Sequence, residues 1–268
     1  MATVYIKPGT GTGTGTASDP YFYSQLSSAE TAAESGGTIL FLDGDYNFST
    51  NFTWGADGVT YKSLNRLGAK ILTTANNLIF GIGSSLITAP TIADGFYVEN
   101  FLLKLTSPEQ TVDTNKVAKF NNLKLVQNLR HTGANCIYAG SDAASFHEVN
   151  GCELNCKPAS SGCRPFQGCS GGTMTRSSVY IDFDANVTFN DRGTAKFDTF
   201  TNCIIASNGN GTFTENYSSN STNCLFYQMG TTNNSGGTNN ISQQDPLFVD
   251  AGNDLRLRPA SPAIGAAS

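Results

Sequence analysis

Short stretches of alternating apolar residues recur along this chain, each preceded by a small or amide residue. They are ENFLLKL, NNLKLVQ, NGCELNC, SSVYIDF, TNCIIAS and TNCLFYQ, with anchors at Asn100, Asn122, Gly151, Ser178, Asn202 and Asn223. Successive anchors are 22, 29, 27, 24 and 21 residues apart. Alternation is the period of a β-strand, and one such strand cannot bury its apolar face alone. Stacked repeats can, so the pattern predicts a solenoid of parallel strands.

The apolar residues of these strands should share one core. Those expected to point inward are Phe101, Leu103, Leu105, Leu123, Leu125, Cys152, Leu154, Cys156, Val179, Ile181, Phe183, Cys203, Ile205, Cys224 and Phe226. Three of the seven cysteines (Cys152, Cys203 and Cys224) occupy the same position of the repeat. We therefore expect these three to be small buried residues.

The first fifty residues are expected to cover one end of the stack. Residues 27–30 (Ser-Ser-Ala-Glu) have the pattern of a capping box, and Gly36-Gly37 would end the helix. The apolar stripe of this helix would be Leu26, Ala29, Ala32 and Ala33. The run PGTGTGTGTASDP, residues 8–20, lacks the Lys-Ser/Thr ending of a phosphate-binding loop. We expect it to join the first strand to the helix, exposed at the N-terminal end.

Composition and charge narrow the class of protein. Hydrophobic residues make up 39% of the chain and charged residues 14%, which disfavours a helix-rich protein. The net charge is −5 and no basic patch is visible, so we expect no nucleic-acid partner. No apolar run reaches the roughly 20 residues that span a bilayer, and the start MATVYIKPG has no apolar leader region. Neither membrane insertion nor a signal peptide is expected.

Both ends of the chain resemble those of parallel β-helix proteins of the pectate-lyase-like superfamily. The start carries TVYIKPGTG and SDPYFYSQLSSAETAAESGGTILFLDGDYNF, and the end carries DPLFVDAGNDLRLRPASPAIGAAS, with Gly265 where members often have Asp. The resemblance implies an all-β fold: a single-stranded right-handed parallel β-helix with an N-terminal capping helix. One domain would span residues 1–268. The cap and first coil would occupy residues 1–50, the central coils 96–230, and a C-terminal segment 241–268.

The opening also resembles short β-helix proteins of tailed bacteriophages, especially those of marine cyanobacteria. This second resemblance rests on the Thr-Val-Tyr-Ile-Lys opening, the Gly-Thr run and the missing leader. It implies a virion protein, made in the host cytoplasm, that contacts other virion proteins and a host surface polysaccharide.

Outward residues at one position of successive repeats should stack in columns. Aligning the anchors gives Leu102, Lys124, Glu153, Tyr180, Ile204 and Leu225, then Lys104, Val126, Asn155, Asp182, Ala206 and Tyr227, then Thr106, Asn128, Lys157, Asp184, Asn208 and Met229. Opposite charges then become neighbours, Lys124 with Glu153 and Lys157 with Asp184. Together with Tyr180 and Asp182 they would form a polar patch on one face.

Two interpretations of this patch stay open. Ordinary cross-strand ion pairs, worth roughly 0.2–1 kcal/mol each, would explain it. Alternatively it is a saccharide groove in which Lys157 or Tyr180 removes the proton alpha to a uronate carboxylate. The candidate catalytic residues are Lys157, Tyr180 and Asp182, and the candidate glycan-binding residues are Glu153, Asn155, Asp184 and Arg192. Ca²⁺ would be expected only for a lyase, and otherwise no cofactor.

No complete catalytic or metal-binding set is visible in the sequence. Both the aspartate cluster with a basic residue of pectate lyases and the His-Gly and Arg-x-Lys of galacturonan hydrolases are incomplete. His131 and His147 have no carboxylate, Ser or Cys partner at a telling spacing, and we expect corner or surface positions for them. Cys156, Cys163 and Cys169 match no common zinc spacing. No metal site is predicted.

These observations favour a non-catalytic structural or adhesion component of a phage virion, such as a tail spike or a capsid decoration. The alternative is a polysaccharide lyase or glycoside hydrolase acting on acidic polysaccharide, and a bacterial surface protein is a third class. The outward columns also contain apolar residues, which need a cover. Either a loop such as residues 231–242 folds over them, or a second subunit of a homotrimer does.

Overall fold

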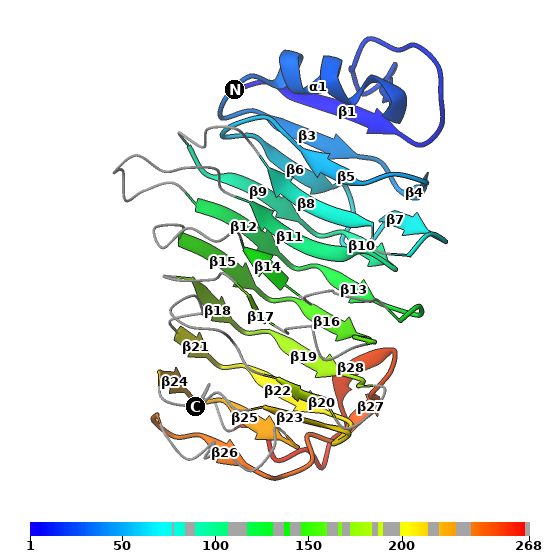
Figure 1. Ribbon diagram of the computed structural model, residues 1–268. Helices are drawn as coiled ribbons and strands as arrows, with labels where there is room; N and C mark the ends of the chain where they lie inside the picture. The colour runs from blue at the N-terminus through cyan, green and yellow to red at the C-terminus, as the bar shows by residue number, and fades with distance from the viewer. Residues whose placement is uncertain are drawn as a thin grey trace.

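The computed structural model confirms a parallel β-solenoid with one short α-helix near its N-terminus (Figure 1). The structure describes residues 1–76, 78–83, 89–106, 117–130, 137–139, 146–159, 166–167, 172–183, 187–189, 199–213, 220–228 and 237–265. The chain passes in turn through three stacked sheets, and each strand pairs with its counterparts in the neighbouring coils. All ladders of these three sheets that the described residues form are parallel.

The first sheet runs the length of the solenoid. In spatial order its ten strands are β2 (Tyr21–Phe22), β1 (Thr3–Lys7), β3 (Thr38–Phe41), β6 (Thr60–Ser63), β9 (Thr91–Asp94), β12 (Val117–Asn121), β15 (Phe146–Asn150), β18 (Thr173–Thr175), β21 (Thr199–Thr201) and β24 (Ser221–Thr222).

The second sheet has nine strands and carries the outer face that matters for function. In spatial order they are β26 (Ile241–Ser242), β25 (Leu225–Tyr227), β22 (Ile204–Ser207), β19 (Ser178–Ile181), β16 (Glu153–Cys156), β13 (Lys124–Val126), β10 (Tyr97–Glu99), β7 (Ala69–Thr73) and β4 (Gly44–Phe48).

The remaining strands form one shorter sheet and two strand pairs. The third sheet contains β17 (Phe166–Gln167), β14 (Ile137–Ala139), β11 (Leu102–Thr106), β8 (Ile79–Gly83) and β5 (Phe52–Trp54). One pair is parallel, β20 (Val187–Phe189) with β23 (Gly211–Phe213), and the other is the antiparallel hairpin β27 (Phe248–Asp250) and β28 (Asp254–Leu257). Coils therefore already form between residues 52 and 94, before the central segment expected from the repeats.

The core lies between the sheets, and the predicted inward residues occupy it. All of them are buried except Leu105, whose side chain lies outside the described residues. Aromatic rings fill the N-terminal coils, where Trp54 and Tyr61 stack with their ring centroids 4.8 Å apart. His147 corrects an expectation: it points into the core with 1% of its surface exposed, not to a corner or the surface.

Four of the six anchors turn the chain between the first and second sheets, whereas Asn100 lies between the second and third sheets. Asn122, Asn202 and Asn223 have φ between 53° and 54°, and Gly151 has φ of 66°. This left-handed conformation is tolerated by Gly and Asn. The predicted anchor Ser178 is wrong: Arg176, with φ of 49°, takes that place. The anchor was therefore assigned two residues too late in this coil.

The N-terminal cap contains the expected helix, but the helix starts at a different residue from the one predicted. Helix α1 spans Leu26–Ala33 and follows a 3₁₀ turn at Tyr23–Gln25. The predicted capping box at residues 27–30 is wrong, because these residues lie inside the helix and its N-cap is Gln25. Glu30 instead accepts hydrogen bonds from the Tyr61 hydroxyl at 2.7 Å and the Gly55 N–H at 3.2 Å. Of the predicted stripe, Ala29 and Ala33 are buried and Ala32 is exposed.

The Gly-Thr run joins β1 to β2 and the helix region, as predicted, and it packs back on the cap. The Gly13 N–H donates to Gln25 Oε1 at 2.8 Å, and the Tyr5 N–H donates to the Gly15 carbonyl at 2.9 Å. A Cβ atom on Gly13 would clash with the backbone of Pro20. Glycine is therefore required for this close backbone approach.

Candidate functional site

The outer face of the second sheet is covered around β19 and β22 by the C-terminal hairpin β27–β28, which lies beside β19 in Figure 1. Phe248 and Leu255 of the hairpin pack with Ala206 in one buried cluster, and the rings of Phe248 and Tyr180 meet edge to face at 6.3 Å. The apolar outward residues Val126 and Leu225 are 5% and 2% exposed. Around Ala206 the cover thus comes from the chain's own C-terminal segment, and this part of the face no longer argues for a second subunit. Residues 231–236 of the predicted covering loop lie outside the described residues.

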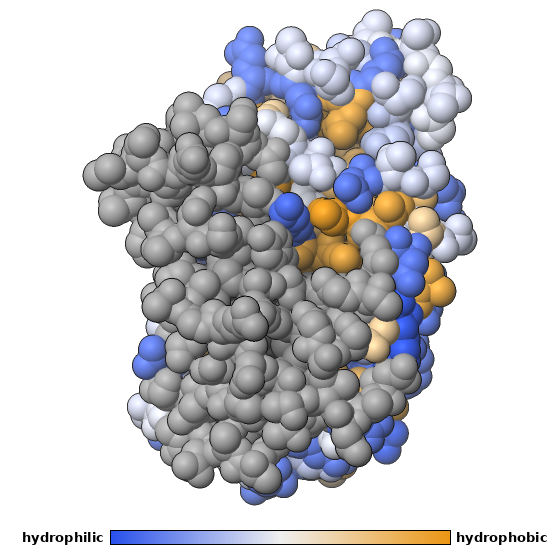
Figure 2. Space-filling view, in the orientation of Figure 1, coloured by the Kyte–Doolittle hydropathy of each residue, from blue (hydrophilic) through white to orange (hydrophobic). Residues whose placement is uncertain are grey.

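Few large hydrophobic residues are exposed on the described part of the molecule. Met1, Leu64, Val249 and Ile264 are its exposed large hydrophobic residues. In the view of Figure 2, apolar surface gathers over the N-terminal half and is flanked by polar residues. The exposed hydrophobic residues are well separated along the chain, which is ordinary for a protein surface.

Two ion pairs lie near each other, one on the second sheet and one on the hairpin. The predicted pair of Lys124 and Glu153 is confirmed, with 3.4 Å between Nζ and Oε2. Above it, Asp254 and Arg256 of β28 form their own pair at 2.6 Å. Arg256 lowers the pKa of Asp254 to about 2, and Lys124 acts in the same direction. Glu153 likewise helps to raise the pKa of Arg256. The polar patch predicted from the columns is therefore partly the docking surface of the hairpin.

The predicted column containing Glu153 and Tyr180 is wrong by two residues. Glu153 pairs with Ser178, and Tyr180 pairs with Asn155. Leu102 belongs to the third sheet, and the neighbour of Lys124 in the preceding coil is Tyr97. The pairs further along, Ile204 with Leu225 and Ala206 with Tyr227, are confirmed.

Two of the candidate site residues are not free to bind a ligand: Asn155 is buried, and Asp182 is already paired. Asn155 is 2% exposed, and its amide makes no hydrogen bond within the described part of the chain. Asp182 forms an ion pair with Arg130 at 3.4 Å and accepts a hydrogen bond from Asn208 Nδ2 at 2.7 Å. Arg130 also donates to the Asp182 carbonyl at 2.8 Å. Asp182 thus ties three coils together, a role that the sequence did not reveal because Arg130 lies outside the repeats.

Of the remaining candidate site residues, Lys157 lies close to Asp182, and two fall outside the described residues. Lys157 lies opposite Asp182 when the ladder of β16 and β19 is continued. Hydrogen bonds from Asn253 and Gly252 lower the pKa of Asp250, and Lys157 acts in the same direction from the solenoid. Asp184 and Arg192 fall outside the described residues, as does the predicted pair of Lys157 with Asp184.

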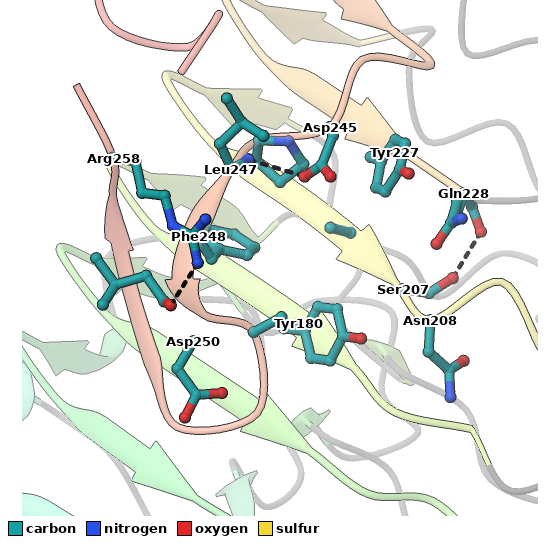
Figure 3. Close-up of a pocket in the computed structure, with 14 residues that line it drawn as sticks. Tyr180, Ser207, Asn208, Tyr227, Gln228, Asp245, Leu247, Phe248, Asp250 and Arg258 are labelled. Atoms are coloured by element: carbon teal, nitrogen blue, oxygen red, sulfur yellow. Dashed lines mark hydrogen bonds between the residues drawn. The ribbon is translucent and has the colours of Figure 1, made fainter. Parts of the chain in front are cut away.

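A groove opens where the hairpin meets the last coils; we call it the hairpin groove (Figure 3). Its volume is about 670 Å³, and its lining residues are Tyr180, Ala206, Ser207, Asn208, Tyr227, Gln228, residues 245–251 and Arg258. Figure 3 shows two tyrosines and two amides on the solenoid side, facing Asp245 and Phe248 of the C-terminal segment. Of the predicted site residues, Tyr180 lines this groove. Tyr227, Asp245 and Gln228 were missed as site residues.

The surroundings of Tyr180 in the groove decide whether it could act as the general base that the sequence suggested. Burial raises the pKa of Tyr180, and the carboxylates of Asp182 and Asp245 raise it further. A phenol with a raised pKa stays protonated at neutral pH, so Tyr180 can donate a hydrogen bond to a ligand and is a poor general base. Among the described residues, no three His, Cys, Asp or Glu side chains are placed to hold a metal ion. The described chain also contains no helix of the length and apolar character that crosses a membrane.

A comparison with protein-family models finds no match for this chain, and a comparison with curated proteins finds none. Two features of the chain bear on its function: the hairpin groove and the resemblance at its two ends.

Proposed function

We propose that the protein is a non-catalytic adhesion component of a bacteriophage virion and that its hairpin groove binds a glycan. The observation that carries the glycan proposal is the juxtaposition of Tyr180 and Tyr227 with Asn208, Gln228 and Asp245 around one groove. Its volume of about 670 Å³ is within the range of about 300–1,000 Å³ that is usual for ligand sites. A sugar has apolar faces and a rim of hydroxyls, which fit tyrosine rings and planar polar side chains respectively.

The charges of the groove favour a sugar without a carboxylate. Asp245 and Asp250 line it, and the one basic lining residue, Arg258, donates to the carbonyl of Val249 in its own hairpin at 3.1 Å. A uronate would meet like charges here, whereas a neutral or amino sugar would not. This supports a neutral or amino sugar as ligand over the acidic polysaccharide that a lyase would need.

The virion part of the proposal is supported by the resemblance at the N-terminus and by the form of the molecule. A stack of parallel sheets is a rigid scaffold whose side groove can face a cell surface. We further propose other virion proteins as partners and a homotrimer as the assembly. The part of the second sheet around Ala206 does not contribute to that assembly, because the hairpin covers it.

Glycan binding should depend on Tyr227. In calorimetric titrations with neutral and amino-sugar oligosaccharides, Tyr227→Ala should weaken binding about tenfold or more, the loss typical of an aromatic anchor. Tyr97→Ala is the matched control, since Tyr97 lies on the outer face of the same sheet but outside the groove. An unsaturated-uronate absorbance signal with pectate or alginate would contradict the non-catalytic proposal. Equal loss in both variants would contradict the groove as the site.

The virion proposal has its own test. Mass spectrometry of purified phage particles from an infected culture should find the protein in stoichiometric amounts. Its presence in lysate but not in particles would contradict the virion proposal and leave glycan binding to be judged by the titrations alone.

A further inference from the structure

The four described cysteines are all buried, and two of them are neighbours in one column of the solenoid. This column lies one residue before the strands of the second sheet. In spatial order it contains Leu123, Cys152, Ser177, Cys203, Cys224 and Asn240. Cys203 and Cys224 therefore lie in successive coils at the same position. Cys152 has Leu123 and Ser177 on its two sides.

The two cysteines are in direct contact. The Cys203 N–H donates to Cys224 Sγ at 3.4 Å. The Cys203 thiol donates to the carbonyls of Met174 and Thr201, both at 3.3 Å. Neighbouring strands lie about 4.8 Å apart. This spacing is within the range of about 4.4–6.8 Å between Cα atoms that a disulfide bridges. No large movement of the backbone is needed to join them.

A small hollow borders this pair. Its volume is about 170 Å³, and it is lined by Cys203, Cys224, Ile204, Leu225 and Leu257, among others. Since a water molecule takes about 30 Å³ of liquid volume, a molecule of peroxide size fits. A bulky thiol reagent such as glutathione disulfide does not.

We propose that Cys203 and Cys224 form a site of oxidation that closes to a disulfide between neighbouring coils when the protein meets a small peroxide. In the first step one thiolate attacks a peroxide oxygen, the O–O bond breaks, and a sulfenic acid and water form. The second thiolate then attacks the sulfenic sulfur, and the S–O bond breaks with release of a second water. Two thiols are oxidised and one peroxide is reduced to two waters.

Their hydrogen bonds assign the order of attack. The neighbouring Cys203 side chain and the Cys203 N–H, which donates to Cys224 Sγ, lower the pKa of Cys224, whereas burial raises the pKa of Cys203. The thiolate is the reactive form, so Cys224 attacks first. The closed bridge would hold together the two coils beneath the end of the C-terminal hairpin, and would do so only after the protein leaves a reducing cytoplasm.

The experiment is peroxide treatment of the full chain, followed by alkylation, chymotrypsin digestion and mass spectrometry. Chymotrypsin cleaves after Phe213 and Tyr217, so peptides with Cys203 and Cys224 stay joined only through a disulfide. We expect this joined pair, the loss of two alkylatable thiols, and a rise in melting temperature of about 5 °C. The joined pair and the rise should be absent in Cys203→Ser and Cys224→Ser. Both should persist in Cys152→Ser, a control from the same column.

The digest of the wild-type chain alone shows whether Cys203 and Cys224 form a disulfide, even if a variant folds poorly. Sulfinic acid at Cys203 or Cys224 without a joined pair would overturn the proposal, as would a disulfide of either residue with another cysteine. Unchanged thiols after peroxide treatment would overturn it too. None of these outcomes bears on glycan binding.

Discussion

Replacing Phe248 with alanine is expected to release the C-terminal hairpin from the solenoid. Phe248 is 6% exposed, meets the ring of Tyr180 and packs with Leu255 and Ala206. Truncating a buried phenylalanine costs about 3–5 kcal/mol. The remaining contacts of a hairpin with few residues cannot offset that loss. Amide hydrogen exchange of β27 and β28 should therefore become much faster, and binding of an apolar dye should increase as the face around Ala206 and Ile204 is exposed.

Val249→Ala is the matched control, because Val249 is the next residue of the same strand and is 42% exposed. This change should leave hydrogen exchange and dye binding near those of the unmodified chain. Unchanged hydrogen exchange in Phe248→Ala would contradict the assignment of this ring as the anchor of the hairpin. The groove is built from both the hairpin and the solenoid, so Phe248→Ala should weaken glycan binding as well.

The alternation of apolar residues was sufficient to predict the fold and the core. Each predicted inward residue with a described side chain is buried, from Phe101 to Phe226. The reason is physical: side chains of a strand point to opposite faces in turn, and only one face can be buried by stacking. The pair of Lys124 with Glu153 was also predicted, because Asn122 and Gly151 both turn the chain two residues before it.

The same alternation could not fix the register of every coil. A shift of two residues keeps all inward residues inward, so the apolar pattern does not detect it. Only the residue with positive φ marks the turn, and in one coil this is Arg176, a residue type that does not favour such a conformation. Asp182 was therefore placed beside Asn155, where the structure has Tyr180.

The hairpin groove could not be predicted from the repeats, because it is formed partly by a C-terminal segment that lies outside them. The C-terminal hairpin pairs with itself in antiparallel fashion and docks on the solenoid through Phe248 and Leu255. The sequence identified a C-terminal segment but not the face on which it would lie. Tyr180 was found because it belongs to a repeat, whereas Asp245 lies in the segment between the coils and the hairpin.

Acid should destabilise the protein through His147. This imidazole is 1% exposed, and neither ring nitrogen makes a full hydrogen bond within the described residues. Burial lowers its pKa from 6.5 to about 4, and a backbone group of Ala118 opposes this shift only in part. Between these two pKa values the unfolded chain binds a proton that the folded chain does not. Stability is therefore fully present above about pH 6.5 and falls with pH, with a total loss of about 3 kcal/mol near pH 4.

The measurement is urea unfolding at pH 7 and at pH 4.5, for the unmodified chain and for His147→Leu. Carboxylates also titrate in this range, so the informative quantity is the difference between the two proteins at each pH. Leucine cannot take up a proton, and its apolar side chain suits a site beside Ala118, which is the neighbour of His147 on the adjacent strand β12. The variant should gain about 2–3 kcal/mol relative to the unmodified chain on going from pH 7 to pH 4.5. Parallel pH dependence of the two proteins would show that His147 titrates normally and would contradict its burial as a neutral core residue.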